Sequence, residues 1–360
     1  MDGYDVVIIG AGPSGTTLGY ELARRGVPVL ILEKERLPRN KTCAGGVTFR
    51  AAELLDFDID EVTQSIAYGM RISYQLNDYC IKRYRDPFVH SVMRRDFDYL
   101  LAQKAQEAGA VVIDGVRAES LDTSGEHVRV VTKKGDFTAR IVAGADGASG
   151  MVASNTGLMK DAVVELALEA EVSVEENILS DWDSLIGVDL GQIPGGYGWV
   201  FPKRQHLSVG VTGPAQLSKR FKSYLESILQ QFGEHEVIDF SGHLMPMRRR
   251  GSAIQRGGVL LLGDAAGLIH PLSGEGIYYA IRSAQLAAPV IADTLRKDTI
   301  DLRGYQRAVD SELMPGLEVG RILLKLFTLS PRFCYTVVKK SDLLWGCVCW
   351  ALMGSRPAYS

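Results

Sequence analysis

The chain has 360 residues, and its hydrophobic share of 46% and charged share of 23% are typical of a soluble globular protein of two joined domains. A formal net charge of −3 offers no general attraction to nucleic acid, so a nucleic-acid partner is not expected. The five cysteines, an odd number, form neither a disulfide framework nor a zinc pattern. We therefore expect reduced thiols, no metal site, no secretory leader before the first strand, and a cytoplasmic protein.

The first thirty-three residues contain the strongest motif. The predicted elements are a strand over 5–9, a helix over 16–25 and a second strand over 27–32. Between the first two, Gly10 suits a tight turn, Gly12 lets a pyrophosphate approach the backbone, and Gly15 lets the helix pack closely. Glu33 follows the second strand, where a carboxylate suits a ribose hydroxyl. This order predicts a dinucleotide-binding unit with the pyrophosphate at a helix N-terminus.

Short strands and one long helix follow. We predict a short helix over 50–55, strands over 66–76 and 79–84, a helix from Ser91 to about 108, a strand over 111–114 and a β-meander over 117–142. Cys43 precedes two closely spaced glycines, so its loop could approach a ligand, although an incidental cysteine is an alternative. Arg94 could reach a cofactor or form a surface ion pair, and Asp146 could contact a cofactor or belong to an ordinary turn.

The chain changes character from residue 162 to about 242, which we expect to form a substrate domain. Strands are predicted over 163–174 and 207–212 and a helix over 217–232. An extended stretch from Pro194 to Lys203 places Tyr197, Trp199 and Phe201 on one side. That aromatic side could be sheet core, or it could line a long apolar ligand with Lys203 at one end.

The chain then returns to the first domain. We predict a buried strand over 258–262 and a helix over 277–295. Asp264 follows that strand directly, and a buried acid is costly unless it is paired or hydrogen-bonded, which favours a functional role. Gly274 and Gly276 lead into the helix, whose N-terminus could stabilise negative charge on a reduced ring.

The longest apolar run lies near the C-terminus, over 343–354, and is shorter than the ~20 residues that span a bilayer. It contains Trp345 and Trp350, which would suit a membrane interface. A buried C-terminal helix and an interfacial helix are both compatible with this pattern.

The order of these motifs resembles the FAD-binding flavoproteins of the para-hydroxybenzoate hydroxylase type. Within them, Pro194-x-x-Tyr197-x-Trp199-x-Phe201-Pro202-Lys203 and Lys41-x-Cys43-x-Gly45 are similar to signatures of the geranylgeranyl reductases. The resemblance implies an α/β fold. It has a Rossmann-type domain with a parallel sheet (1–65, 90–160 and 250–300), an inserted antiparallel-sheet domain for the prenyl substrate (66–89 and 161–249) and C-terminal helices (301–360).

The resemblance also implies roles for individual residues. Cys43 and Tyr197 would be the candidate catalytic acids, and Tyr197, Trp199, Phe201, Pro202 and Lys203 would bind the substrate. The residues that would hold FAD are Gly10, Gly12, Pro13, Ser14, Gly15, Glu33, Lys34, Cys43, Ala44, Gly45, Arg94, Asp146, Gly263, Asp264, Gly274, Gly276 and Ile277.

The implied reaction is the FAD-dependent saturation of carbon–carbon double bonds in a geranylgeranyl chain carried by a lipid, diphosphate or pigment precursor. The electron donor would be NADPH or reduced ferredoxin, because nothing resembles a second nucleotide motif. Peripheral membrane contact would bring the enzyme to its substrate. Two alternatives use the same fold: an FAD-dependent monooxygenase or halogenase, and a non-catalytic flavoprotein that binds isoprenoid lipid.

Overall fold

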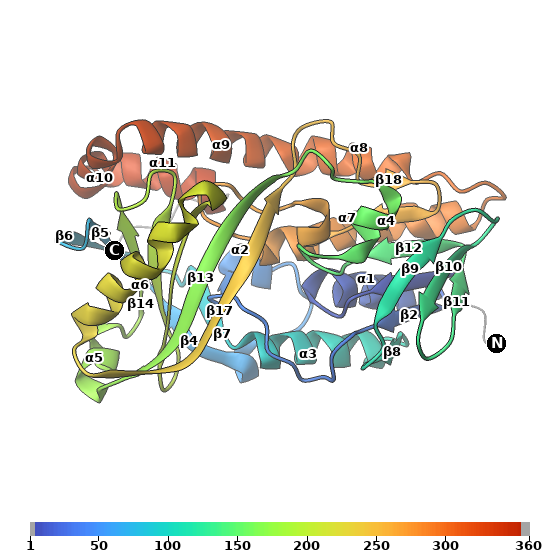
Figure 1. The fold of residues 1–360 in the computed structure, drawn as a ribbon, viewed down its shortest axis with the longest axis horizontal. Coiled ribbons are helices and arrows are strands. Elements are labelled where there is room, and N and C mark those ends of the chain that lie inside the picture. Colours follow the sequence, from blue (N-terminus) through green and yellow to red (C-terminus); the bar gives the residue numbers. More distant parts are fainter. Residues whose placement is uncertain (1–3, 354–360) are drawn as a thin grey trace.

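The computed structural model describes residues 4–353, without the side chains of residues 347, 348 and 350–353. Two large sheets lie side by side along the molecule, and helices α8, α9 and α10 run along one edge of it (Figure 1). Strands β10 and β11 lie at the right of this view and helix α10 at the left. The fold is the predicted mixture of a parallel-sheet domain, a second sheet and C-terminal helices.

The first sheet has six strands in the order β18-β19-β12-β1-β2-β8. Its strands are β1 (Val6–Ile9), β2 (Val29–Leu32), β8 (Val111–Ile113), β12 (Ile141–Gly144), β19 (Val259–Leu261) and β18 (Gln255–Arg256). All pairings are parallel except that of β18 with β19. The strands β1, β2, β12 and β19 are buried along their whole length, as expected of a parallel sheet covered on both faces.

Helices α1 (Pro13–Ala23), α3 (Arg94–Glu107) and α7 (Ile277–Leu295) accompany this sheet, with α3 and α7 both packed on α1 (Figure 1). Helix α7 has the predicted bounds. Helix α1 begins three residues before the predicted Thr16, because Gly12 is its N-cap and Pro13 occupies the first helical turn. A proline there loses no hydrogen bond and has a φ angle suited to the helix.

The second sheet has seven strands in the order β17-β13-β16-β15-β14-β5-β6. They are β5 (Gly69–Tyr74), β6 (Asp78–Arg83), β13 (Val163–Val174), β14 (Leu185–Leu190), β15 (Tyr197–Pro202), β16 (Leu207–Pro214) and β17 (His235–Met247). The sheet is antiparallel except for the parallel pair β5 and β14. Helix α6 (Phe221–Leu229) packs on one face, and α5 (Glu176–Asp181) follows β13.

Smaller elements accompany the two sheets. They are the sheet β3 (Gly46–Thr48), β7 (Val89–Val92) and β4 (Thr63–Ala67), the meander β9 (Ala118–Asp122), β10 (Val128–Thr132) and β11 (Phe137–Ala139), and the helices α2 (Phe49–Ala52) and α4 (Met151–Thr156). Two predicted bounds were wrong here. Ser91 lies in β7 rather than in helix α3, and the strand predicted over 66–76 is divided between β4 and β5. Both differences arise from pairing with distant strands, which overrides local helix or strand preference.

The C-terminal helices are α8 (Arg303–Glu312), α9 (Met314–Leu329), α10 (Pro331–Lys340) and α11 (Asp342–Met353). Trp345 and Cys349 of α11 are buried against the second sheet together with Tyr335 of α10. On the opposite side of α11, Leu343 and Leu344 are exposed. The C-terminal run is therefore partly core and partly surface, while the side chain of Trp350 and residue 354 lie outside the described part of the chain.

Candidate active site

A large cavity of about 1110 Å³ lies where the two sheets meet. Its lining comes from the glycine-rich turn, the loop that carries Cys43, the inner face of the second sheet, the start of α7 and the C-terminal helices. This volume is slightly above the usual range of ligand cavities, about 300–1,000 Å³. The cavity has a polar end and an apolar end, and each has room for an organic ligand.

The glycine-rich turn forms a backbone cradle at one end of the cavity. Gly10 has a φ of +105°, and a Cβ on Gly15 would lie 1.9 Å from the carbonyl oxygen of Gly10. A Cβ on Gly12 would meet only the tip of Arg39, at 3.8 Å, so the space beside Gly12 is open. The N-terminus of α1 has no side-chain cap. Its free N–H groups are therefore available to an anionic ligand.

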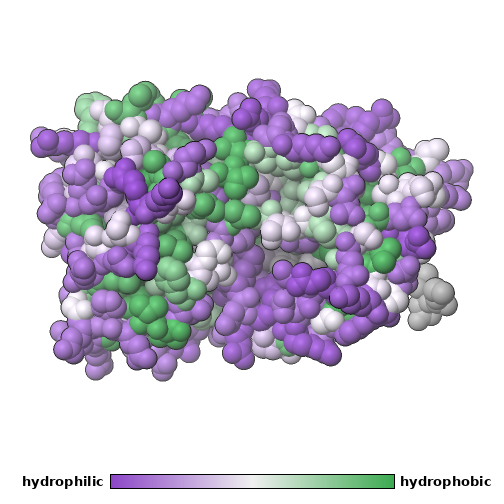
Figure 2. Space-filling view, in the orientation of Figure 1, coloured by the Kyte–Doolittle hydropathy of each residue, from purple (hydrophilic) through white to green (hydrophobic). Residues whose placement is uncertain are grey.

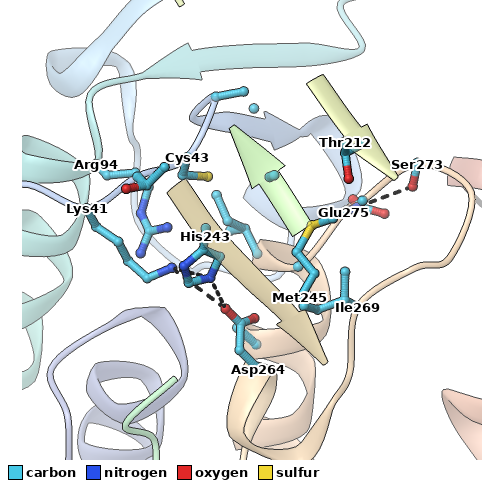
Figure 3. A pocket seen from close by; sticks show the side chains of 18 of the residues that line it. Lys41, Cys43, Arg94, Thr212, His243, Met245, Asp264, Ile269, Ser273 and Glu275 are labelled. Atoms are coloured by element: carbon cyan, nitrogen blue, oxygen red, sulfur yellow. Dashed lines mark hydrogen bonds and ion pairs between the residues drawn. The ribbon is translucent and has the colours of Figure 1, made fainter. Parts of the chain in front are cut away.

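A buried network of charges supports the cradle. One carboxylate oxygen of Glu33 accepts the N–H of Ala11 at 2.9 Å, and Glu33 also lies 3.4 Å from Arg39. Asp98 accepts hydrogen bonds from Arg39 at 2.9 Å and from two nitrogens of Arg94 at 2.8 Å each. The pair Arg94–Asp98 is thus a buried, bidentate ion pair rather than the surface pair considered from the sequence. Arg94 still lines the cavity, near Cys43 (Figure 3).

Asp264 belongs to a second cluster, with Lys41 and His243 (Figure 3). Its Oδ2 lies 3.3 Å from His243 Nε2 and 3.7 Å from Lys41 Nζ, and Lys41 Nζ lies 3.4 Å from the same histidine nitrogen. Burial alone would raise the pKa of Asp264, but Lys41 and His243 lower it well below its usual range. Burial also lowers the pKa of His243. The carboxylate is therefore ionised at neutral pH, beside one fixed positive charge.

The turn before α7 completes this part of the cavity. Gly274, Gly276 and Ile277 all line it, and Gly276 is the N-cap of α7. A Cβ on Gly276 would lie 3.2 Å from Asp264 Oδ1. The N-terminus of a long helix thus faces the cavity beside Asp264, as predicted.

Asp146 lies on the other side of the cradle. Its Oδ2 accepts the N–H of Val152 at 3.0 Å, while Oδ1 is buried without a hydrogen-bond partner among the described residues. Burial raises the pKa of this carboxyl, although backbone N–H groups oppose the shift. An unpaired buried oxygen in a cavity wall is a position that a bound ligand can satisfy.

The loop that carries Cys43 is held from below by two side chains of the second sheet. Lys203 Nζ donates to the carbonyl oxygens of Ala44 at 2.6 Å and Val92 at 2.9 Å, and burial lowers the pKa of Lys203. Glu169 accepts the N–H of Cys43 at 3.2 Å. The Cys43 sulfur accepts the N–H of Gly45 at 3.4 Å and lies in the cavity lining.

The other end of the cavity is apolar. Tyr197, Trp199 and Phe201 project from β15 into it, which is the aromatic row predicted from residue alternation. The Tyr197 hydroxyl donates to the carbonyl oxygen of Ser273 at 2.6 Å, and burial raises the pKa of Tyr197. The opposite wall comes from the C-terminal helices and comprises Leu323, Leu326, Phe327, Phe333, Val337 and Val338.

Most of the residues predicted from the sequence line this one cavity. Those that do are Gly10, Gly12, Pro13, Ser14, Glu33, Lys34, Cys43, Ala44, Arg94, Asp146, Tyr197, Trp199, Phe201, Asp264, Gly274, Gly276 and Ile277. Those outside the lining are Gly15, Gly45, Pro202, Lys203 and Gly263. Gly15 and Gly45 instead allow close backbone packing, since a Cβ on Gly45 would lie 2.0 Å from the carbonyl oxygen of Val92. Lys203 is buried beneath the Cys43 loop and does not close the apolar end.

Sequence reasoning missed several residues of the site. Arg39, Glu169, His243 and Glu275 were not recognised as site residues, and none belongs to a short local motif. Glu169 had one signal, since a charged residue in a strand with apolar neighbours on both sides suggests a buried polar group. Within residues 4–353, no cluster of histidine, cysteine and acidic side chains has a geometry that could hold a metal ion.

The model of the FAD binding domain family matches residues 3–305. The chain belongs to this FAD-binding family. It is 30% identical over 328 residues to an uncharacterized protein of Methanosarcina barkeri, covering 91% of this chain and 84% of that one. It is 28% identical over 345 residues to digeranylgeranylglycerophospholipid reductase 1 of Methanopyrus kandleri, covering 88% and 89%. Its homologues therefore include geranylgeranyl reductases.

Solved structures share the fold. A geranylgeranyl bacteriochlorophyll reductase-like protein of Thermoplasma acidophilum superposes with a TM-score of 0.86 at 22% identity, covering 95% of this chain and 92% of that one. The flavin-dependent brominase Bmp2 gives a TM-score of 0.80 at 22% identity, with coverages of 98% and 94%. Since a reductase-like protein and a brominase both match, the fold alone does not separate the two chemistries.

The residues of the polar end fit FAD. A glycine cradle at a helix N-terminus, an open space beside Gly12 and an unpaired oxygen on Asp146 suit the adenosine diphosphate part of a dinucleotide. The N-terminus of α7 faces the cavity where negative charge could be stabilised. The family match and this geometry agree on an FAD-binding domain.

Proposed function

We propose that the protein is an FAD-dependent reductase that saturates double bonds of a geranylgeranyl chain carried by a lipid, diphosphate or pigment precursor. The observation that carries the proposal is the apolar end of the cavity, which continues directly from the polar cradle. Burial of a prenyl chain contributes about 0.8 kcal/mol per CH₂ group, so a long apolar pocket is the principal requirement for such a substrate. The names of the curated relatives support the same substrate class.

We assign the binding of FAD to the domain of the first sheet and the binding of the prenyl chain to the domain of the second sheet. Residues 1–65, 90–160 and 250–300 would form the FAD domain, and residues 66–89 and 161–249 the prenyl domain. In the FAD domain, the turn from Gly10 to Gly15 would hold the pyrophosphate, with Arg94 and Asp264 toward the ribityl region and Gly274–Ile277 at the pyrimidine end. The remaining predicted cofactor residues, such as Gly263 and Gly45, would act by fixing the backbone around the site.

FAD held by the glycine cradle would supply hydride chemistry when reduced, and the protein would have to supply a proton to the other carbon of the alkene. An isolated alkene offers no carbonyl to accept negative charge, so positive character develops at the more substituted carbon. The faces of Trp199 and Phe201 would stabilise that character by about 1 kcal/mol each. Cys43 is the favoured proton donor, because the Tyr197 hydroxyl is committed to Ser273 and its raised pKa makes it a poor acid.

Access to the substrate would come from a membrane surface. Leu326 and Phe333 line the cavity and are also exposed, so the apolar end reaches the surface between α9 and α10. Figure 2 shows apolar side chains gathered over this part of the molecule. Between residues 319 and 340 the sequence has basic residues and no acidic ones, a pattern that favours anionic lipid. In the described part of the chain, every helix is too short or too polar to cross a bilayer.

The protein would then work in the cytoplasm at the membrane face, with NADPH or reduced ferredoxin as external reductant.

The decisive test is anaerobic. The flavin of the purified protein is reduced with dithionite, geranylgeranyl lipid or diphosphate is added, and flavin reoxidation is followed together with the mass of the lipid. Reoxidation with hydrogen added to the chain supports the proposal. Flavin that stays reduced until oxygen enters would contradict it and favour a monooxygenase, a halogenase or a lipid-binding flavoprotein.

A matched pair of variants connects the activity to the site. Cys43→Ala should slow reoxidation by the lipid at least about a hundredfold, the usual contribution of a positioned acid. Cys80→Ala, which removes a half-buried thiol of β6 outside the cavity lining, should leave the rate unchanged. Equal rates for wild type and Cys43→Ala would remove Cys43 from the role of proton donor.

A further inference from the structure

His270 lies behind the turn that leads into α7, and the reaction scheme above does not use it. Its side chain is buried and lies outside the cavity lining, whereas residues 272–277 of the turn all belong to that lining. The ring stacks on that of Tyr279 in α7, with centroids 6.3 Å apart and planes 21° apart. Any effect of His270 on a ligand in the cavity must therefore pass through the turn in front of it.

One nitrogen of the His270 ring holds Ser273. Nδ1 accepts the N–H of Ser273 at 3.2 Å and lies 3.1 Å from the Ser273 hydroxyl oxygen. That hydroxyl oxygen accepts the N–H of Glu275 at 3.4 Å (Figure 3). Because Nδ1 is an acceptor, the proton of the neutral ring belongs on Nε2. Burial lowers the pKa of His270 to about 3, so the ring is neutral at the pH of a working enzyme.

Ser273 is also held by the second sheet. Its carbonyl oxygen accepts the Tyr197 hydroxyl of β15 at 2.6 Å, so both polar groups of its backbone have side-chain partners. The chain continues through Gly274 to Gly276, the N-cap of α7, and both glycines line the cavity. A shift of Ser273 would therefore move the free N–H groups of this helix end relative to a bound ligand.

Helix α9 covers the Nε2 side of the His270 ring. A Cβ on Gly320 would lie 2.6 Å from Nε2 and 2.7 Å from Cε1, so α9 packs against the ring at a residue that has no side chain. Farther along the same helix, Leu323 and Phe327 line the apolar end of the cavity. Helix α9 thus contacts both the apolar pocket and the ring that holds Ser273.

Resting on the placement of FAD proposed above, we propose that His270 is a positioning residue that fixes the turn at the pyrimidine end of the flavin. It acts through Ser273 and touches neither FAD nor substrate. The ring sets how closely the N-terminus of α7 approaches the flavin, and this helix end favours the negative charge of the reduced flavin. The contact of Gly320 with His270 then fixes the flavin-side turn against the helix that walls the apolar pocket.

Two substitutions of the histidine separate the hold on Ser273 from the presence of a polar side chain. His270→Asn keeps an acceptor oxygen at the place of Nδ1 and should behave as wild type. His270→Gln extends its amide toward the place of Nε2 and should release Ser273. FAD-loaded His270→Gln should lose about fivefold of the preference for reduced over oxidised FAD. Anaerobic dye equilibration would record this loss as a more negative midpoint potential.

A second pair of variants reaches the same ring from α9. Gly320→Ala places a methyl group 2.6 Å from Nε2, whereas Gly316→Ala, one turn earlier in the helix, meets only the Tyr279 hydroxyl at 3.6 Å, an ordinary contact. Gly320→Ala should shift the midpoint potential in the same direction as His270→Gln. Gly316→Ala should leave it at the wild-type value. If Gly320→Ala does not fold, the two histidine variants decide the proposal.

Equal potentials in wild type and His270→Gln would overturn the proposal, and so would an unchanged potential in folded Gly320→Ala. An equal shift in His270→Asn would also overturn it, because the hold on Ser273 would then not be the cause. Lower stability of His270→Gln in urea with an unchanged potential would assign a purely structural role and refute positioning. None of these measurements uses a prenyl substrate. A protein that reduces no prenyl lipid would therefore refute the reductase function and leave the role of His270 standing.

Discussion

The ammonium group of Lys203 donates a hydrogen bond of 2.6 Å to the carbonyl oxygen of Ala44 and so connects the second sheet to the loop of Cys43. A second hydrogen bond to Val92 makes this lysine a link between three segments distant in sequence. The contact fixes the position of Ala44, which lines the cavity, although Lys203 itself lies outside the lining.

Replacing Lys203 with methionine should destabilise the protein and loosen the Cys43 loop. The carbonyl oxygens of Ala44 and Val92 would lose their donor, and an unsatisfied buried acceptor costs about 1–3 kcal/mol. We expect a loss of about 2 kcal/mol in the free energy of unfolding, measured with urea, and faster loss of flavin on dilution. Lys219→Met, at an exposed position, is the control and should change neither quantity. A stable Lys203→Met protein with full flavin content would contradict the linking role.

Two glycine variants should separate folding from cofactor binding. Gly15→Ala places a Cβ 1.9 Å from a backbone oxygen, so α1 must shift, and we expect a loss of about 3 kcal/mol in stability. Gly12→Ala has room for its methyl group in the protein, with its nearest neighbour at 3.8 Å, but fills the space that a pyrophosphate would occupy. It should fold with nearly unchanged melting temperature as apoprotein and bind FAD at least tenfold more weakly, as titration of the apoprotein would show.

Asp264→Asn should remove a pH-dependent stabilisation. The folded pKa of Asp264 is lowered, so its charge stabilises the protein fully above the unfolded value of about 3.9 and progressively less as pH falls toward the folded value. The difference in free energy of unfolding between wild type and Asp264→Asn should therefore be constant above about pH 5 and shrink below about pH 4. Urea titrations between pH 3 and pH 7 measure it, and a difference that grows toward acid pH would refute the ion cluster.

The apolar surface over α9 should bind lipid. Ile322→Glu places a charge on this surface at a residue that is 60% exposed, and it should weaken binding to anionic vesicles at least about fivefold in a sedimentation assay. Ile238 on the edge strand β17 is 59% exposed and lies away from the C-terminal helices, so Ile238→Glu is the matched control. Equal losses in both variants would show that general hydrophobicity, rather than the α9 surface, governs binding.

The local sequence order determined the nucleotide cradle. Strand β1, the turn from Gly10 to Gly15 and helix α1 are contiguous, so their geometry follows from β-branched residues, glycine conformations and a helix cap within one short stretch. The same reason explains why the bounds of α7 and β13 agree with the prediction. The family resemblance, carried by motifs of this local kind, was confirmed by the comparison with known families.

The alternation of residues along a strand also predicted correctly that the aromatic side chains of β15 share one side. It does not predict which segments of the chain pack against them. Lys203 has the same parity as Tyr197 and Phe201, and it does point toward the same side of the sheet. What only the tertiary structure decided is that the Cys43 loop covers Lys203 while the C-terminal helices cover the aromatic row. The two-residue repeat of a strand determines the side of the sheet toward which a side chain points. The residues that it contacts depend on which distant segment packs over that side.

The charged clusters depended entirely on the tertiary fold. Lys41, His243 and Asp264 come from three elements far apart in sequence, and no local spacing relates them. Glu169 reaches Cys43 only because β13 crosses beneath the loop. Sequence determined the cradle because its chemistry is backbone chemistry over neighbouring residues. Tertiary structure alone decided the charges around Asp264 and Cys43, since electrostatic partners are chosen by proximity in space.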